Sequence, residues 1–85
     1  MIIRVQTGYI YVQFSPTDWK LKQGGARSVI EIIKTEIGHV SRNPDGFNYD
    51  ENDGTWTMKD TASNRSVLER AKEKYIDFPN QEKLF

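Results

Sequence analysis

The segment from residue 47 to residue 58 constrains the fold of this chain more than any other. It holds two short apolar stretches around an acidic turn. The Asp53-Gly54 pair within that turn is a strong hairpin signal, because glycine adopts positive φ without steric cost. We therefore predict a β-hairpin that buries one face against flanking helices. The large side chains predicted on that face are Phe47, Tyr49, Trp56 and Met58.

A chain of 85 residues that is 36% hydrophobic and 12% aromatic has the composition of one small folded domain. We expect this domain to span residues 1–78, with a polar tail over residues 79–85. The chain has no cysteine, no apolar signal-peptide core and no apolar run near the roughly 20 residues that span a bilayer. We therefore expect a cytoplasmic protein that does not enter the membrane.

Apolar side chains alternate with polar ones through residues 2–14, which indicates strands with one buried face. Gly8 either closes a tight hairpin here or forms a bulge in one long strand, and we favour the hairpin. Tyr9, Tyr11 and Gln13 then line the face opposite the core. Exposed tyrosines on a strand stack on nucleic-acid bases or anchor a protein partner, unless a helix covers them.

Pro16 ends this strand region, because proline fixes φ and cannot donate to the ladder. Lysines, two glycines and an arginine follow over residues 20–27, just before a predicted helix. Cations near helix N-terminal amides favour an anion site, although the P-loop spacing is absent. The alternative is a plain flexible connection in which Trp19 packs into the core.

Helical spacing of apolar residues predicts a first helix over residues 26–37, capped by Gly38. A second helix is predicted to start at a cap formed by Ser63 or Asn64, with an apolar stripe at Val67, Leu68, Ala71 and Tyr75. Its exposed face gains support from Arg65–Glu69 and Glu69–Lys72 pairs. Residues 77–79 are expected to end it.

The predicted order is strand-strand-helix followed by strand-strand-helix. Two hairpins joined into one antiparallel sheet, with both helices on one face, give a two-layer α+β fold of ββαββα order.

Catalytic and metal-binding chemistry has little support in the sequence. His39 is the single histidine, and no cysteine accompanies it, so it is a poor metal ligand or general base. The acidic segment 45–60 does not fit a calcium loop: with Gly54 as the turn glycine, Tyr49 takes the first ligand position and Asp60 the last. We expect no enzyme activity, no metal and no cofactor.

Formal net charge is zero, but charge is distributed unevenly along the chain. Residues 1–42 contain six basic and three acidic residues, whereas residues 43–85 contain six basic and nine acidic ones. A polyanion would therefore meet the first half, unless the difference reflects only a mixed solvated surface.

Tyr49-Asp50, five intervening residues and Trp56 resemble the Tyr-Asp-Pro-Glu-x-x-x-Trp hairpin of HARP-type domains, which accompany annealing helicases. The similarity covers about residues 28–76, with Glu51 in place of the proline and Asn52 in place of the glutamate. The resemblance implies a DNA- or RNA-associated accessory module without its own catalysis, in which the tyrosine and tryptophan are mainly structural.

Two functions therefore remain open. The first is a non-catalytic nucleic-acid-associated module, although zero net charge is unusual for such proteins. Its candidate contacts are Lys20, Lys22, Arg27, Arg42, Tyr9, Tyr11 and Trp19. The alternative is a small protein-interaction or inhibitor module, of phage type or homodimeric through a sheet edge, which neutral charge and exposed tyrosines suit.

Overall fold

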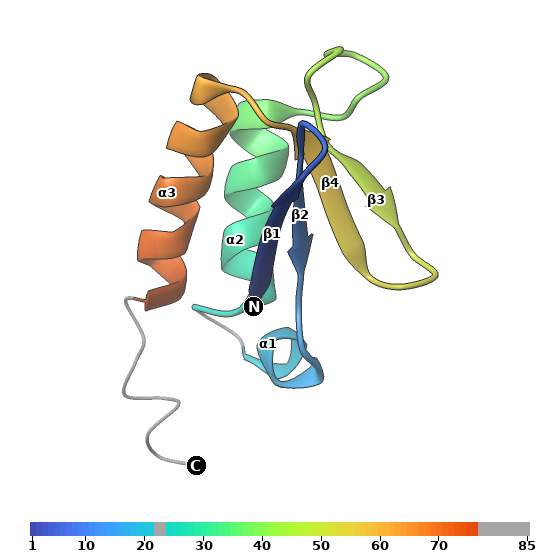
Figure 1. Ribbon diagram of the computed structural model, residues 1–85. Coiled ribbons are helices and arrows are strands. Elements are labelled where there is room, and N and C mark those ends of the chain that lie inside the picture. The colour runs from blue at the N-terminus through green and yellow to red at the C-terminus, as the bar shows by residue number, and fades with distance from the viewer. Residues whose placement is uncertain (22–23, 77–85) are drawn as a thin grey trace.

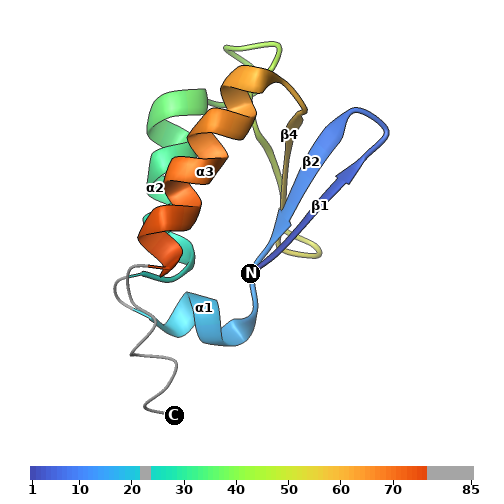
Figure 2. The same ribbon diagram turned by 60° about the vertical axis from the view of Figure 1, so that its left-hand side comes forward.

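A four-stranded antiparallel sheet forms one layer of the structure, and helices form the other (Figures 1 and 2). The computed structural model describes residues 1–21 and 24–76. The elements in chain order are β1 (Ile2–Gln6), β2 (Tyr9–Gln13), α1 (Pro16–Lys20), α2 (Ala26–Ile32), η1 (Ile33–Ile37), β3 (Asn48–Asp50), β4 (Thr55–Lys59) and α3 (Ala62–Ile76).

The predicted two-layer α+β architecture is confirmed. The strands lie in the order β1-β2-β4-β3, so the two hairpins meet where β2 pairs with β4. Figure 2 shows α2 and α3 on the same face of the sheet. The opposite face carries no helix in the described part of the chain.

The first hairpin is tight, as predicted. Gln6 pairs with Tyr9, and the two residues between them, Thr7 and Gly8, both have positive φ, at 51° and 85°. Two consecutive positive φ values are the signature of the type I′ turn, whose twist matches that of the flanking strands. The bulge alternative is therefore excluded.

The second hairpin forms where the sequence placed it, but one of its four side chains is not buried. Phe47, Trp56 and Met58 lie in the core, whereas Tyr49 is 38% exposed. Tyr49 faces the same side as its cross-strand partner Trp56. It stays exposed because β3 is an edge strand and no described helix covers its end of the sheet. The prediction of an interior tyrosine was therefore wrong.

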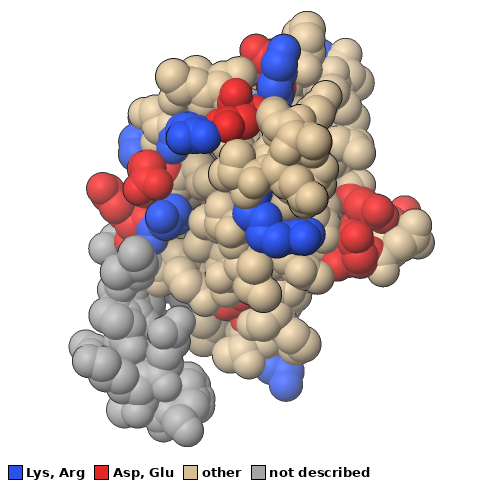
Figure 3. Space-filling view, in the orientation of Figure 1, with Lys and Arg blue, Asp and Glu red and all other residues tan. Residues whose placement is uncertain are grey.

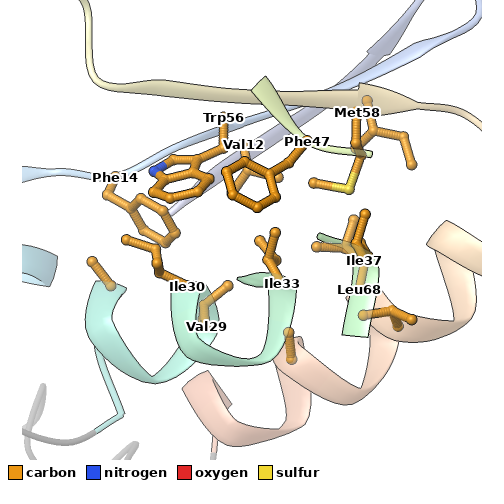
Figure 4. Close-up of a cluster of buried hydrophobic side chains, with 14 residues drawn as sticks. Val12, Phe14, Val29, Ile30, Ile33, Ile37, Phe47, Trp56, Met58 and Leu68 are labelled. Carbon is orange, nitrogen blue, oxygen red and sulfur yellow. The ribbon is translucent and has the colours of Figure 1, made fainter. Parts of the chain in front are cut away.

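The core lies between the sheet and the first predicted helix, which runs without a break as α2 and η1 (Figure 4). Ile30, Ile33 and Ile37 point from it towards the strands. The same buried cluster includes Val67, Leu68 and Ala71 of α3. The final turn is a π-helix, and Gly38 follows it with a φ of 79°. Positive φ at this position confirms the predicted glycine cap.

An additional short helix, α1, occupies the segment that the sequence analysis treated as a strand end and connection. Ser15 caps it: its Oγ accepts from the Asp18 backbone N–H, while the Asp18 carboxylate accepts from the Ser15 N–H. Pro16 stands in the first turn, where a missing N–H costs nothing. The Ser-Pro-x-Asp pattern is a capping box, and it was the overlooked signal.

The start of α3 also differs from the prediction. Thr61, rather than Ser63 or Asn64, accepts the hydrogen bond from the N–H at the third helical position. Arg65 pairs with Asp60 instead of Glu69, because two guanidinium nitrogens reach both carboxylate oxygens. The Glu69–Lys72 pair is present. The predicted helix end and tail, residues 77–85, lie outside the described residues.

Candidate functional site

An open pocket of about 670 Å³ lies between α2 and the second hairpin. This volume falls within the range of about 300–1,000 Å³ that is usual for small-ligand sites. The residues that line it are Trp19, Arg27, Ile30, Glu31, Lys34, His39, Phe47, Tyr49 and Trp56. Five of these nine side chains are aromatic rings, and three are charged, so the wall is stacking surface with a charged rim.

The helix contributes one wall through four residues at positions i, i+3, i+4 and i+7, which fall on one side of an α-helix. Ile30 is buried and belongs to the core, whereas Arg27, Glu31 and Lys34 are exposed. The charged groups therefore stand at the mouth of the pocket, where they can meet a ligand without being desolvated in the empty state.

The hairpin contributes the aromatic wall. The rings of Tyr49 and Trp56 lie 4.7 Å apart between centroids, and those of Phe47 and Trp56 lie 4.8 Å apart. His39 meets Phe47 edge-on at 5.3 Å. Trp19, half-buried on α1, is also part of the lining. This arrangement exists because the inner side of the edge strand β3 is left uncovered by the described helices.

One polar atom in this wall lacks a partner. Trp56 is only 4% exposed, and its Nε1 makes no hydrogen bond among the described residues. Figure 4 shows this nitrogen at the Phe14 side of the indole ring. Phe14 in turn meets Trp19 edge-on at 5.7 Å between ring centroids. Leaving such a donor unpaired costs about 1–3 kcal/mol.

The electrostatics of the pocket favour a planar ligand with negative charge nearby. Lys34 Nζ lies 5.8 Å from the centroid of the Trp56 ring, within cation–π range. Arg27 supplies a second cation and Glu31 a single anion. His39 Nδ1 accepts a hydrogen bond from the Ser41 backbone N–H and so is already engaged.

The structure brings together two of the predicted nucleic-acid contacts and separates the others. Trp19 and Arg27 line the pocket. Tyr9 and Tyr11 lie on the uncovered outer face of the sheet, as predicted, with Arg4 5.5 Å from the Tyr11 ring centroid. Their ladder neighbours Ile10 and Val12 are fully buried on the inner face.

Lys20 and Arg42 are not part of the pocket lining. Lys20 ends α1, whereas Arg42 belongs to the loop after η1, at the opposite end of the molecule (Figure 1). Lys22 lies outside the described residues. The predicted contacts therefore do not form one surface.

The two glycines of the predicted anion site are buried at the junction between α1 and α2. Gly24 and Gly25 are both buried, and the Gly24 N–H donates to Ser28 Oγ at 2.9 Å. A Cβ at Gly25 would collide with the backbone oxygen of Asp18. Gly25 thus allows close approach between α1 and the start of α2.

Sequence reasoning missed Lys34, Glu31, Tyr49 and Trp56 as site residues. The available signal was the helical spacing that joins Lys34 to Arg27. This spacing was not used, because all the aromatic side chains of the hairpin were predicted to be buried in the core. No pocket was therefore expected beside this face of the helix.

A smaller pocket of about 150 Å³ lies between the first hairpin and α3. Residues 1–21 and 24–76 contain no cluster of three or more metal-ligating side chains. None of their helices has the length and apolar character needed to cross a membrane. Comparison with protein-family models, curated proteins and solved structures found no significant match.

Proposed function

We propose that this protein is a non-catalytic module that associates with single-stranded nucleic acid through the pocket between α2 and the second hairpin. The observation that carries the proposal is the combination of aromatic rings, including that of the 38% exposed Tyr49, with Arg27 and Lys34 in one lining. Stacking surface beside cations is the general means by which proteins hold unpaired nucleotides. The HARP-like segment, residues 49–56, contributes two of the aromatic rings and supports the same class of function.

Single strands are favoured over duplexes for a geometric reason. Duplex binding requires a long basic face or an element that fits a groove, and the formal net charge of this chain is zero. The exposed acidic side chains Asp50, Glu51 and Asp53 gather at the β3–β4 turn, on the right of Figure 3. A rigid duplex meets this turn, whereas a flexible strand avoids it.

Fluorescence anisotropy with labelled single-stranded and duplex oligonucleotides, at two salt concentrations, tests the proposal. We expect salt-sensitive binding that is tighter for single strands, and a loss of about tenfold for Lys34→Glu because one phosphate contact becomes a repulsion. Arg42→Glu is the matched control: it makes the same charge change on an exposed side chain outside the pocket lining. Equal losses for both variants, or no binding by the wild type, would contradict the proposal.

A protein-interaction module remains the second candidate, and the free edge of the sheet favours it. In β1, Ile2 is 59% exposed and Val5 is 53% exposed, and the strand contains no proline. Exposed apolar edge strands readily pair with another strand. Light scattering separates the two: a stable dimer together with absent oligonucleotide binding would support this second function.

A further inference from the structure

We propose that the pocket takes one unstacked nucleobase, whose acceptor atom receives the N–H of Trp56 while the adjoining phosphate meets Lys34 or Arg27. This inference rests on the proposed function and specifies how the ligand is held. It depends on three features of the pocket: its stacking surface, its unpaired donor and the sign of its charged rim.

One ring of the stacking surface, that of Tyr49, is exposed without rearrangement. Tyr49 is 38% exposed, although it faces the same side of the sheet as the buried Trp56. Its ring is held by Trp56 at 4.7 Å, so its position is fixed before any ligand arrives. A pre-positioned ring loses little conformational entropy on binding, and a base stacked on it gains accordingly.

The unpaired donor requires an acceptor. Trp56 Nε1 has no partner among the described residues and lies in a residue that is 96% removed from solvent. A base offers ring nitrogens and carbonyl oxygens as acceptors at its edge, and a hydrogen bond from Nε1 recovers the cost of leaving that donor unpaired. Because the atom is covered, a wall side chain moves to admit the base. Trp19, on the five-residue helix α1, is the wall residue in contact with Phe14.

The charged rim excludes other ligands of similar size. A quaternary ammonium group suits an aromatic cage but is repelled here by Arg27 and Lys34. A purely apolar ligand satisfies neither the indole N–H nor these cations. Glu31 can accept a hydrogen bond from an exocyclic amino group, which adenine, guanine and cytosine carry and simple carboxylates lack. A nucleotide matches donor, acceptor, ring and charge together.

An oligonucleotide of eight nucleotides and an abasic strand of equal length and charge provide the test. We expect the base-containing strand to bind about tenfold more tightly, because base–aromatic stacking is lost in the abasic strand. Tyr49→Ala removes this difference, and Trp56→Phe, which keeps a ring but deletes the N–H, reduces it. Tyr9→Ala, on the outer face of the sheet, leaves it unchanged.

The outcomes distinguish the two proposals. Equal binding of both strands overturns base capture but leaves a phosphate-binding module intact. A base preference lost in Tyr9→Ala and kept in Tyr49→Ala also overturns it, because the bases then stack on the outer face. Absence of binding to either strand overturns the proposed function itself. Thermal melting of Tyr49→Ala checks folding, and its half-exposed side chain makes a large loss of stability unexpected.

Discussion

Asp18 contacts two residues that are remote from it in the sequence, Met1 and Tyr75. Its carboxylate lies 2.8 Å from the α-amino nitrogen of Met1 and accepts a hydrogen bond from the Tyr75 hydroxyl at 2.7 Å. The aspartate is only 2% exposed, so the pair is buried. Through these two contacts Asp18, on α1, links the residue before β1 to the last turn of α3. Asp18 therefore connects the sheet to the helix layer.

Acid should therefore weaken this protein through Asp18. Burial by itself raises the pKa of Asp18, but hydrogen bonds from the Met1 amino group, Tyr75 and the Ser15 backbone outweigh it and lower the pKa below its ordinary value of 3.8. A lowered folded pKa means that the stabilisation is complete above the unfolded value. It is lost as the pH falls from about 5 through 3.8 towards the folded value.

The measurement is urea denaturation of the wild type and Asp18→Asn at pH 7 and pH 3. At pH 7 we expect the variant to lose about 3 kcal/mol of unfolding free energy, because it leaves a buried ammonium group without its counter-ion. At pH 3 the difference between the two proteins should shrink. Glu73→Gln, an exposed site on α3, is the control and should change little at either pH. A pH-independent difference would contradict the assigned role.

At the scale of elements, Asn64 holds the beginning of α3 against the second hairpin. Its side-chain amide donates to the carbonyl oxygens of Asp45 and Lys59, both at 2.8 Å, and the residue is 4% exposed. One amide nitrogen therefore fixes the loop before β3, the end of β4 and the helix start. These hydrogen bonds hold the second hairpin and the loop before it against the start of α3.

Asn64→Ala should lower the free energy of unfolding by about 2 kcal/mol, because two backbone carbonyls lose their shared donor inside the protein. Ser63→Ala is the matched control, since Ser63 is exposed and adjacent. Thermal melting followed by circular dichroism measures both variants. Equal melting temperatures for Asn64→Ala and Ser63→Ala would show that the amide is not a structural tie.

For the whole molecule, the positions of the charged side chains matter more for the approach of a polyanion than the formal net charge of zero. The acidic β3–β4 turn adjoins the hairpin that supplies the aromatic wall, and it repels a polyanion approaching from that end. The cations Arg27 and Lys34 stand on the helix side of the pocket. A bound strand is therefore expected to run along the α2 side, away from the turn.

Glu51→Lys should accordingly tighten single-strand binding several-fold at low salt and make it more salt-dependent, because a repulsion becomes an attraction. Glu73→Lys is the matched control. It carries the same charge change on α3, which lies on the other side of α2 from the second hairpin (Figure 1). Anisotropy titrations at two salt concentrations measure both. Equal gains for the two variants would indicate attraction by total charge alone.

The sequence by itself determined the four strands and the two long helices of this fold, whereas the short helix α1 was not predicted. Alternation marked the four strands, the Thr7-Gly8 and Asp53-Gly54 pairs marked their turns, and helical spacing marked the two long helices. These features are local, since each depends on residues within a few positions of one another. The two-layer arrangement followed, because each apolar face has to be buried against another.

Only the tertiary structure decided which surfaces stay uncovered. Whether Tyr49 is buried depends on how far the helix layer extends over β3, and no local pattern encodes that distance. The pocket likewise requires Trp19, Arg27 and Trp56 to converge from three elements. The partners of Asp18 and Asn64 are also remote in sequence. Convergence of this kind is set by packing between layers, which is why the site was only partly predictable.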